Sequence, residues 1–588
     1  MTSRLPASSV QRVQRKPLRL LIPAILCAPL AWTSCRQPGS PTPISPSPTH
    51  SAAADPQTRA SRATLFIAAR VQNTTEPCGC TSDPLGDVAR VAALVRDAGP
   101  RGLLLDAGGL RYKPTVLPPE KVPQARLKAD FLEATWRGLH AVSMLQTTDL
   151  QGTQGAQELS ARLVSNVDGL PADRVLRESI REVNGLRIGV LGLASPTGAW
   201  PAGIQVQDPV QAGEKALTAL RQQGATLTVA LTGLSRESAR KLARRLPDLD
   251  FVVAGGDDAQ PDGVAKPELL GKTLLVVPAA EAQRLIRIDI FAGQDGAIAL
   301  NWRPTESQRR EQIRLLREQF TQVDDRLRGL RADSQAEPAF VAATEAERAR
   351  LQQELASAEQ PPTSDGPYAT AELIAVSRSL RRDPATAQAM QALDRQIGEA
   401  NLKAAAPSPP PIADQPYYVG AQACQGACHF HDDAFAFWQK TRHAQAFNTL
   451  VHVGKELSYD CVGCHAVAFE EAGGSGLRSL IAWQRHSPGQ TPPTVADLRN
   501  IQCETCHGPG SAHITRPSKN PIPTAKPDQN RCLVCHTKEH SDTFDWQAYL
   551  RDILGPGHGA DRRAALPPGP TGHELRSAAL KARGLAGH

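Results

Sequence analysis

Residues 424–429 read Cys-Gln-Gly-Ala-Cys-His, and two cysteines followed directly by a histidine return three more times by residue 536. The other copies read Cys461-Val-Gly-Cys464-His465, Cys503-Glu-Thr-Cys506-His507 and Cys532-Leu-Val-Cys535-His536. This pattern is typical of covalent haem c attachment, in which both thiols bond to the porphyrin and the histidine ligates the iron. The stretch therefore predicts four covalent haems, the first on Cys424 and Cys428, with the proximal ligands His429, His465, His507 and His536.

Structural zinc is the alternative explanation for paired cysteines. A zinc site takes four ligands, usually as two pairs joined by a short loop, and does not require a histidine directly after the second cysteine. All four cysteine pairs here have that histidine, and the gaps between the pairs are long and unequal. We therefore favour haem, and we expect the first copy to be the weakest attachment because three residues instead of two separate its cysteines.

Histidine is concentrated in the same part of the chain. Of the 15 histidines, 13 lie beyond residue 424, whereas none of the three methionines does. Methionine from this region is therefore excluded as a second axial ligand, which leaves histidine, a weaker donor or an open position. Nine histidines remain after the proximal four, namely His431, His443, His452, His486, His513, His540, His558, His573 and His588.

Residues 1–35 have the features of an export signal. Basic residues without an acid precede an apolar run from Leu20 to Trp32, which is too short to span a membrane as a helix. The run ends at Thr33-Ser34-Cys35, which resembles a bacterial lipoprotein cleavage site, so Cys35 is a predicted lipidation site. Residues 36–62 are rich in proline and serine and are expected to form a tether. We expect an exported protein in the periplasm, or one anchored to a membrane and facing the periplasm or the cell exterior.

Residues 63–304 alternate between strand and helix signals. Helical spacing marks 122–139, 208–224 and 236–245, and Asn184-Gly185 is a hairpin turn signal. Apolar runs predict strands near 64–71, 103–105, 188–193, 226–231, 251–254 and 273–277. This segment is therefore predicted to be an α/β domain.

Several stretches of this domain resemble the metallophosphatase domain of periplasmic 5'-nucleotidases. They read LLLDAGGL, REVNGLRIGVLGL, ARRLPDLDFVVAGGDD and GKTLLVVPAAEAQRLIRIDIF. The resemblance implies an α/β sandwich and a two-metal centre for phosphoester hydrolysis. The histidines of such a centre are missing, since MLQTTDL has neither histidine nor glutamate and Asp257 and Asp258 stand where histidines would be. With Asp106 as the surviving carboxylate, we expect degenerate metal motifs and no phosphatase activity.

Cys78-Gly79-Cys80 occupies the place of the first metal-binding segment in that resemblance. The pair is open to four interpretations: a strained disulfide, a thiol site, part of a metal site or two inert thiols. The surrounding EPCGCTSDPLGDVARVA resembles the opening of exported metallophosphatase-like proteins that carry a multihaem domain at their C-terminus. This second resemblance implies a role for Cys78 and Cys80 without naming it.

Residues 305–404 are expected to form a helical spacer. Apolar residues follow helical spacing from Ile313 to Leu330 within a highly charged segment, which predicts a long amphipathic hairpin or coiled coil. One or two more helices are expected over 369–403, with a break at Asp383-Pro384. Residues 405–416 form a proline-rich linker.

Residues 417–560 resemble the tetrahaem cytochrome family that accepts electrons from hydroxylamine oxidoreductase in ammonia-oxidising bacteria. The resemblance rests on YVGAQACQGACH, WQKTRHAQAF, DCVGCHAVAFEEAGG and CETCHGPGSAH. It implies a mostly helical and irregular domain with closely packed haems, most of them ligated by two histidines. The leading distal candidates by motif position are His443, His513 and His558, and the weaker ones are His452 and His540. His573 and His588, in the polar tail at 561–588, are not expected to be ligands.

These patterns together predict an exported multihaem c-type cytochrome that exchanges electrons with redox partner proteins and is tethered to a membrane by a lipid anchor. The net charge of +7 is too mild to indicate nucleic-acid binding. The alternative is a haem-dependent oxidoreductase that acts on a small nitrogen or sulfur compound at an open iron. A phosphoesterase with a haem appendage is the third and least favoured hypothesis.

Overall fold

The computed structural model describes residues 61–77, 81–151, 160–256, 266–291, 301–360, 366–427, 429 and 433–585. Several residues with sequence predictions lie outside the described residues: Cys35, Cys78, Cys80, Asp257, Asp258, Cys428, His431 and His588. Within the described ranges, none of the helices is long and apolar enough to cross a membrane.

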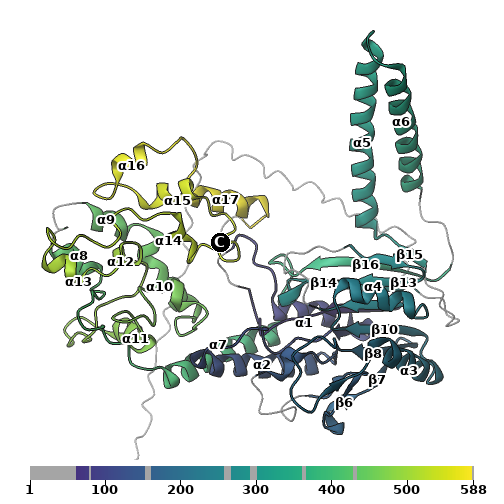
Figure 1. The fold of residues 1–588 in the computed structure, drawn as a ribbon, viewed down its shortest axis with the longest axis horizontal. Coiled ribbons are helices and arrows are strands. Elements are labelled where there is room, and N and C mark those ends of the chain that lie inside the picture. The colour runs from purple at the N-terminus through teal and green to yellow at the C-terminus, as the bar shows by residue number, and fades with distance from the viewer. Residues whose placement is uncertain are drawn as a thin grey trace, which may run out of the picture. The chain divides into compact units, whose positions relative to one another are not determined.

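The N-terminal domain contains two six-stranded sheets (Figure 1). The first has the strand order β15-β16-β14-β1-β2-β3. β1 runs parallel to β2 and antiparallel to β14, so Leu65 lies between Leu103 and Ile288. The strands of this sheet are β1 (Ala63–Ala68), β2 (Gly102–Asp106), β3 (Val142–Ser143), β14 (Arg284–Phe291), β15 (Asn301–Arg303) and β16 (Tyr368–Ala375).

The second sheet has the order β12-β13-β11-β10-β8-β7. Its strands are β7 (Glu178–Val183), β8 (Leu186–Leu193), β10 (Leu227–Thr232), β11 (Phe251–Ala254), β12 (Glu268–Leu270) and β13 (Thr273–Val276). Asn184 and Gly185 form the predicted turn between β7 and β8, and both have positive φ, as a tight hairpin requires. Four short strands form two small pairs: β4 (Arg162–Leu163) with β6 (Val175–Leu176), and β5 (Val167–Asp168) with β9 (Gln205–Val206).

The two sheets share one apolar core, in which Ile67, Val190 and Ile288 are fully buried. Helices α1 (Val88–Asp97) and α2 (Val122–Gly138) pack on the outer face of the first sheet. Helices α3 (Pro209–Gln222) and α4 (Arg236–Arg245) pack on the outer face of the second. The predicted α/β sandwich is confirmed.

The segment after β15 forms the predicted helical hairpin. Helices α5 (Glu306–Ala332) and α6 (Pro338–Glu359) run side by side (Figure 1). Leu316, Val323 and Leu351 form the buried seam between them. Their apolar spacing of three and four residues is the pattern that an antiparallel helix pair needs.

The segment after the hairpin differs from the prediction of helix over 369–403. Tyr368–Ala375 is the strand β16, which pairs along its whole length with β14. The alternating burial of Ala369 and Ala371 fits a sheet position and overrides the helical preference of this alanine-containing segment. Helix α7 (Pro384–Ala404) begins at the expected break, where the Asp383 carboxylate accepts a 2.8 Å bond from the Thr386 N–H.

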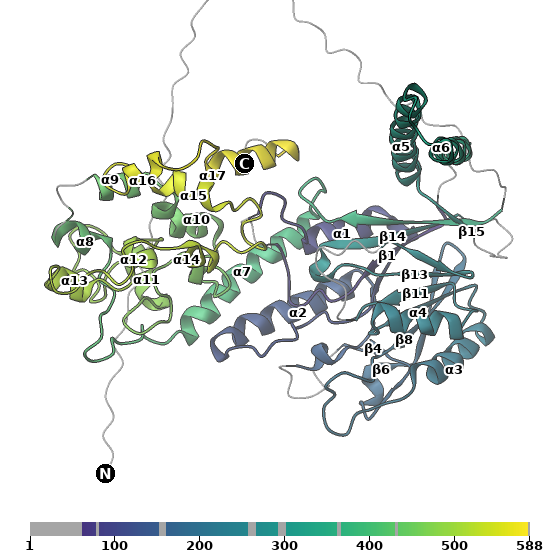
Figure 2. The same ribbon diagram turned by 45° about the horizontal axis from the view of Figure 1, so that its top comes forward.

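The C-terminal region from residue 417 consists of short helices joined by irregular segments (Figure 2). Its main apolar cluster contains Phe447, Leu477 and Leu480, and Leu402 of α7 packs against it. The mostly helical and irregular C-terminal region is as predicted. Its helices are α8 (Ala421–Ala427), α9 (Ala434–Gln439), α10 (Ala446–Val453), α11 (Leu477–Arg485), α12 (Cys503–His507), α13 (Ser511–Thr515), α14 (Gln529–Leu533), α15 (Trp546–Ile553), α16 (Ala560–Ala564) and α17 (Gly572–Ala582).

Candidate haem-attachment sites

The four cysteine motifs lie next to one another in the structure. The thiol of Cys424 in the first motif is hydrogen-bonded to that of Cys503 in the third. Cys464 of the second motif makes the same contact with Cys535 of the fourth, and Cys506 of the third motif also lies near Cys535. The motifs therefore follow one another in space in the order first, third, fourth, second.

A buried carboxylate fixes the third motif against the segment that leads into the first. Cys424 lies in α8, the third motif is itself the helix α12, and the two helices pack together. The side chain of Glu504 in α12 is fully buried and accepts 2.7 Å bonds from the N–H groups of Gly420 and Gly510. Burial raises the pKa of Glu504, and these N–H donors partly offset that effect.

Two of the proximal candidates are oriented through their Nδ1 atoms. The Nδ1–H of His465 donates to the carbonyl of Ala446 at 2.5 Å, and that of His507 donates to the carbonyl of Thr524 at 2.7 Å. Because a carbonyl only accepts, Nδ1 carries the proton and Nε2 keeps a lone pair. This is the tautomer that a metal-ligating histidine requires.

Two distal candidates face proximal candidates across a short gap. The ring centroids of His443 and His536 lie 6.2 Å apart, and those of His507 and His558 lie 6.0 Å apart. One metal ion between two imidazoles needs about 6 Å, because each metal–nitrogen bond is about 2 Å and each nitrogen lies about 1 Å from its ring centre. The Nδ1–H of His558 donates to the carbonyl of Ile553 at 2.8 Å, which again leaves Nε2 available. The residues present therefore fit haem iron at these two positions.

Burial keeps three of these histidines neutral, namely His443, His507 and His536. It lowers the pKa of His443 to about 4, with a smaller contribution from His536. Burial also lowers the pKa of His507 and His536. A neutral imidazole is the form that binds a metal, so at neutral pH these side chains are in the state that iron ligation needs.

The remaining distal candidates are His513, His452 and His540, and their contacts differ from those of His443 and His558. His513 donates from Nδ1 to the carbonyl of Asn520 at 2.9 Å and lies in α13, which packs against α8 and hence near the first motif. His452 is exposed and His540 binds a neighbouring hydroxyl, and neither faces a proximal histidine in the described part of the chain. Within the described residues, no second imidazole lies opposite His465.

The apolar side chains of α9 and of the fourth motif are only partly covered by the protein. Val534, inside the fourth motif, is 68% exposed, and no residue of α9 is buried although the helix contains Phe435, Phe437 and Trp438. Groups of partly exposed apolar side chains often mark a surface that binds another molecule. A porphyrin is flat and apolar, so this lining also fits haem.

Two of the segments that correspond to metal-binding segments in the metallophosphatase resemblance are among the described residues: one ends at Asp106, and the other contains Gln146 and Asp149. Asp106 at the end of β2 is fully buried, and burial together with the charge of Asp149 raises the pKa of Asp106 to about 7. The Asp149 carboxylate accepts backbone N–H bonds, including one from Gly109 at 3.0 Å, and the Gln146 amide donates to two backbone carbonyls. Among the described residues there is no group of three potential metal ligands. These residues do not fit a two-metal centre.

The structure adds contacts that no sequence pattern singled out. Ser82 follows the Cys78-Gly79-Cys80 segment by two positions, and its N–H donates to the Asp542 carboxylate at 3.0 Å. Arg583 of the C-terminal tail donates to the Ser82 hydroxyl at 2.7 Å. Ser82, Asp542 and Glu504 are ordinary polar residues in irregular or short segments, so neither spacing nor composition marks them.

Residues 423–508 match the model of the cytochrome c554 and c-prime family. A segment of 76 residues is 37% identical to the C-type polyheme cytochrome OmcB of Geobacter sulfurreducens, and it covers 13% of this chain and 9% of that protein. The chain thus spans less than a tenth of the length of the curated relatives that it matches. The predicted resemblance of the C-terminal region to multihaem cytochromes is confirmed.

Solved structures with related folds include two from Thermus thermophilus. The 5'-nucleotidase precursor of this organism has a TM-score of 0.39 and 16% identity, over 57% of this chain and 59% of that chain. The sulfate thiohydrolase SoxB in complex with glycerol has a TM-score of 0.33 and 16% identity, over 41% of this chain and 56% of that chain.

Proposed function

We propose that this protein is an exported c-type cytochrome that transfers electrons through four closely spaced haems, most of them ligated by two histidines. The match of residues 423–508 to a multihaem cytochrome family supports electron transfer. The four copies of the attachment motif support the number four, and the contacts between the motifs support close spacing. When bound, haem iron supplies one-electron chemistry by changing between its ferric and ferrous states.

The observation that carries this proposal is the pairing of His443 with His536 and of His507 with His558, at 6.2 and 6.0 Å between ring centres. Two imidazoles fill both axial positions of an iron, so such a site has no position left for a substrate. A site of that kind is suited to electron transfer. In this proposal His513 is the distal ligand of the first motif, because α13 packs against α8.

A pyridine-haemochrome assay, an intact mass and low-temperature EPR of the purified protein test the proposal together. We expect four covalent haems, or three if the Cys424–Cys428 attachment fails, and low-spin signals from at least two irons. A protein that holds zinc and no haem would contradict the proposal.

A second function is favoured by one observation. In the described part of the chain His465 has no imidazole opposite it, so the second iron would have an open position. An open iron binds small ligands, as an oxidoreductase of a small nitrogen or sulfur compound requires. Carbon monoxide added to the reduced protein should then change the spectrum of one haem. An unchanged spectrum would leave electron transfer as the function.

We propose further that the α/β domain has no phosphoesterase activity. Gln146 and Asp149 are hydrogen-bonded to the backbone and Asp106 is buried with a raised pKa, and these observations support the proposal. Nucleotide hydrolysis with added manganese or zinc at about 1 per second or faster would contradict it.

The proposed partners are redox proteins. The proposed location is the periplasm, or a membrane to which a lipid on Cys35 anchors the protein so that it faces the periplasm or the cell exterior. Metabolic labelling with palmitate should mark the natural protein but not the Cys35→Ala variant. Equal labelling of the two would exclude Cys35 as the anchor.

A further inference from the structure

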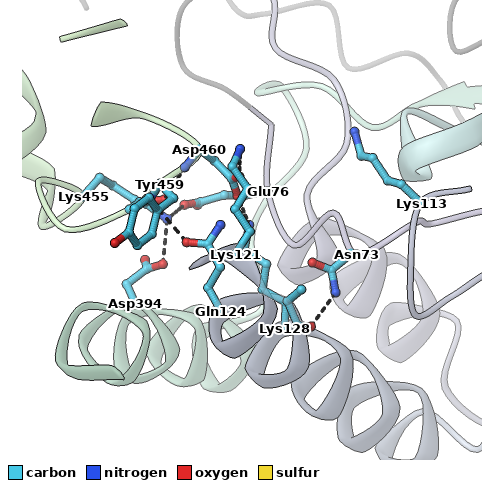
Figure 3. A network of polar contacts seen from close by, with 12 residues as sticks. Asn73, Glu76, Lys113, Lys121, Gln124, Lys128, Asp394, Lys455, Tyr459 and Asp460 are labelled. Carbon is cyan, nitrogen blue, oxygen red and sulfur yellow. Dashed lines mark hydrogen bonds and ion pairs between the residues drawn. The ribbon is translucent and has the colours of Figure 1, made fainter. Parts of the chain in front are cut away.

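The second haem motif lies at a contact between the cytochrome region and the α/β domain (Figure 3). Asp460 immediately precedes Cys461. Its carboxylate oxygens face Lys128 of α2 and Lys121 of the turn that precedes α2. The Nζ of Lys128 lies 2.6 Å from one oxygen, and that of Lys121 lies 3.4 Å from the other. Two cations of the α/β domain are therefore placed next to the attachment site of one haem.

A second ion-pair group lies beside the first. Lys455 pairs with Asp394 of α7 at 2.7 Å and with Glu76 of the α/β domain (Figure 3). The side chain of Lys455 is only 22% exposed. Charges that are paired in this geometry fix the position of one surface on another more than they add affinity.

Uncharged hydrogen bonds lie between these ion pairs and are buried. The Gln124 carbonyl accepts bonds from the Asn401 amide at 2.9 Å and from the Tyr459 N–H at 3.3 Å. The Asn401 amide also donates to the Leu457 carbonyl at 2.9 Å. Gln124 and Asn401 are 2% and 0% exposed. A buried centre surrounded by a more exposed polar rim is the usual anatomy of a specific interface, although the centre here is polar and hydrogen-bonded.

This contact fixes the electrostatic environment of the second motif. An anion beside an iron stabilises its ferric state and lowers the reduction potential, because reduction adds a negative charge. Asp460 is such an anion; its side chain is 43% exposed, so water and salt screen part of its effect and the two lysines act on the remainder. The two lysines oppose the effect of Asp460.

We infer that Lys121 and Lys128 of the α/β domain raise the reduction potential of the haem at Cys461 and Cys464 by neutralising Asp460. This inference rests on the proposed function. In this inference the metallophosphatase-like domain has a role that does not require a metal centre. The domain adjusts the reduction potential of the haem at the second motif, which lies at one end of the haem series. Lys121 and Lys128 are positioning residues in this role, since they act on the haem through Asp460.

A spectroelectrochemical titration of the full-length haem-loaded protein tests the inference. Lys128→Met should shift one of the four titrating components to lower potential, and Asp460→Asn should shift the same component to higher potential. The double variant should titrate close to the natural protein, because both charges of the pair are gone. The matched control is Lys241→Met, which removes an exposed lysine of α4 that pairs with Glu237 at 3.9 Å, and it should leave all four components unchanged.

The outcomes separate this inference from the proposed function. If the natural protein has no covalent haem, the proposed function fails. If it titrates as four haems and both Lys128→Met and Asp460→Asn titrate like the natural protein, only the inference fails. Haem content and far-UV circular dichroism of each variant show whether it folds, and Lys121→Met, which removes the other lysine on Asp460, replaces Lys128→Met if that variant does not fold.

Discussion

The α/β domain and the cytochrome region bury their apolar side chains in different ways. Every residue of β1 is buried against other parts of the protein, whereas no residue of α9 is, although α9 contains two phenylalanines and a tryptophan. The first region closes its core with side chains from two sheets and the helices that cover them. The second leaves apolar surface for a prosthetic group to cover. The comparison teaches that one chain can combine a densely buried core with a region whose aromatic side chains are only half-buried.

Removing haem should give the largest difference in folded structure between the C-terminal region and the α/β domain. In protein produced without haem attachment, residues 417–560 should lose much of their ordered structure, because half-buried apolar side chains such as those of α9 would lose the haem surface that we propose they pack against. The α/β domain should stay folded. Hydrogen exchange measured on both forms checks this, and equal protection of 417–560 with and without haem would contradict it.

A core truncation in the α/β domain should have the reverse effect. Leu65 on β1 is fully buried, so Leu65→Ala should lower the free energy of unfolding of this domain by about 2–5 kcal/mol without changing haem content. Leu269→Ala is the control, because Leu269 is 52% exposed and its truncation should cost less than about 0.5 kcal/mol. Urea unfolding followed by circular dichroism measures both. Similar losses of unfolding free energy in the two variants would show that Leu65 does not lie in the core.

Substitutions of His443 should act on one haem only. His443→Met should keep that iron six-coordinate and raise its potential, since a thioether favours the ferrous state. His443→Ala should open the iron and give a high-spin EPR signal. Titrations of both variants and the natural protein provide the test. Identical titrations with no high-spin signal would exclude His443 as a ligand.

The last prediction concerns the pH dependence of stability that the buried Asp106 carboxyl causes. Because the pKa of Asp106 is raised to about 7 in the folded domain, the folded state holds a proton that the unfolded chain releases near pH 4. The stability that this proton provides is fully present below pH 4 and is lost as the pH rises to about 7, by at most about 4 kcal/mol. Asp106→Asn should remove this pH dependence, as shown by urea unfolding at pH 5 and pH 8. A stability that falls equally with pH in both proteins would assign the effect to other groups.

Local sequence patterns predicted most of the α/β domain. The apolar runs correspond to β1, β2, β8, β10, β11 and β13, and the Asn184-Gly185 turn joins β7 to β8, because a buried strand and a tight turn each depend on few neighbouring residues. The strand β16 was predicted as helix, because its sequence ATAELIA has good helix formers and its partner β14 lies far away in the sequence.

The haem-attachment motifs could be predicted from the sequence because they too are local, whereas the distal histidine pairings could not. The attachment motifs are local and could be identified from spacing alone. The partner of His443 could not, because the ring that it faces is His536, which is brought there by the path of the intervening chain. The contact of Asp460 with Lys128 also joins residues of different domains and has no local signal. Long-range pairings of this kind require the structure.

The strand order of the two sheets also has a consequence for the folding order of the chain. All strands of the second sheet lie between residues 178 and 276, so this sheet can assemble from one continuous segment. The first sheet pairs β1 with β14, for example Leu65 with Ile288, and it is completed by β16, which ends at Ala375. Closing a long loop costs more entropy and slows folding, so we expect residues 178–276 to nucleate the domain. The first sheet would then close around this nucleus late, after the chain up to residue 375 has become available.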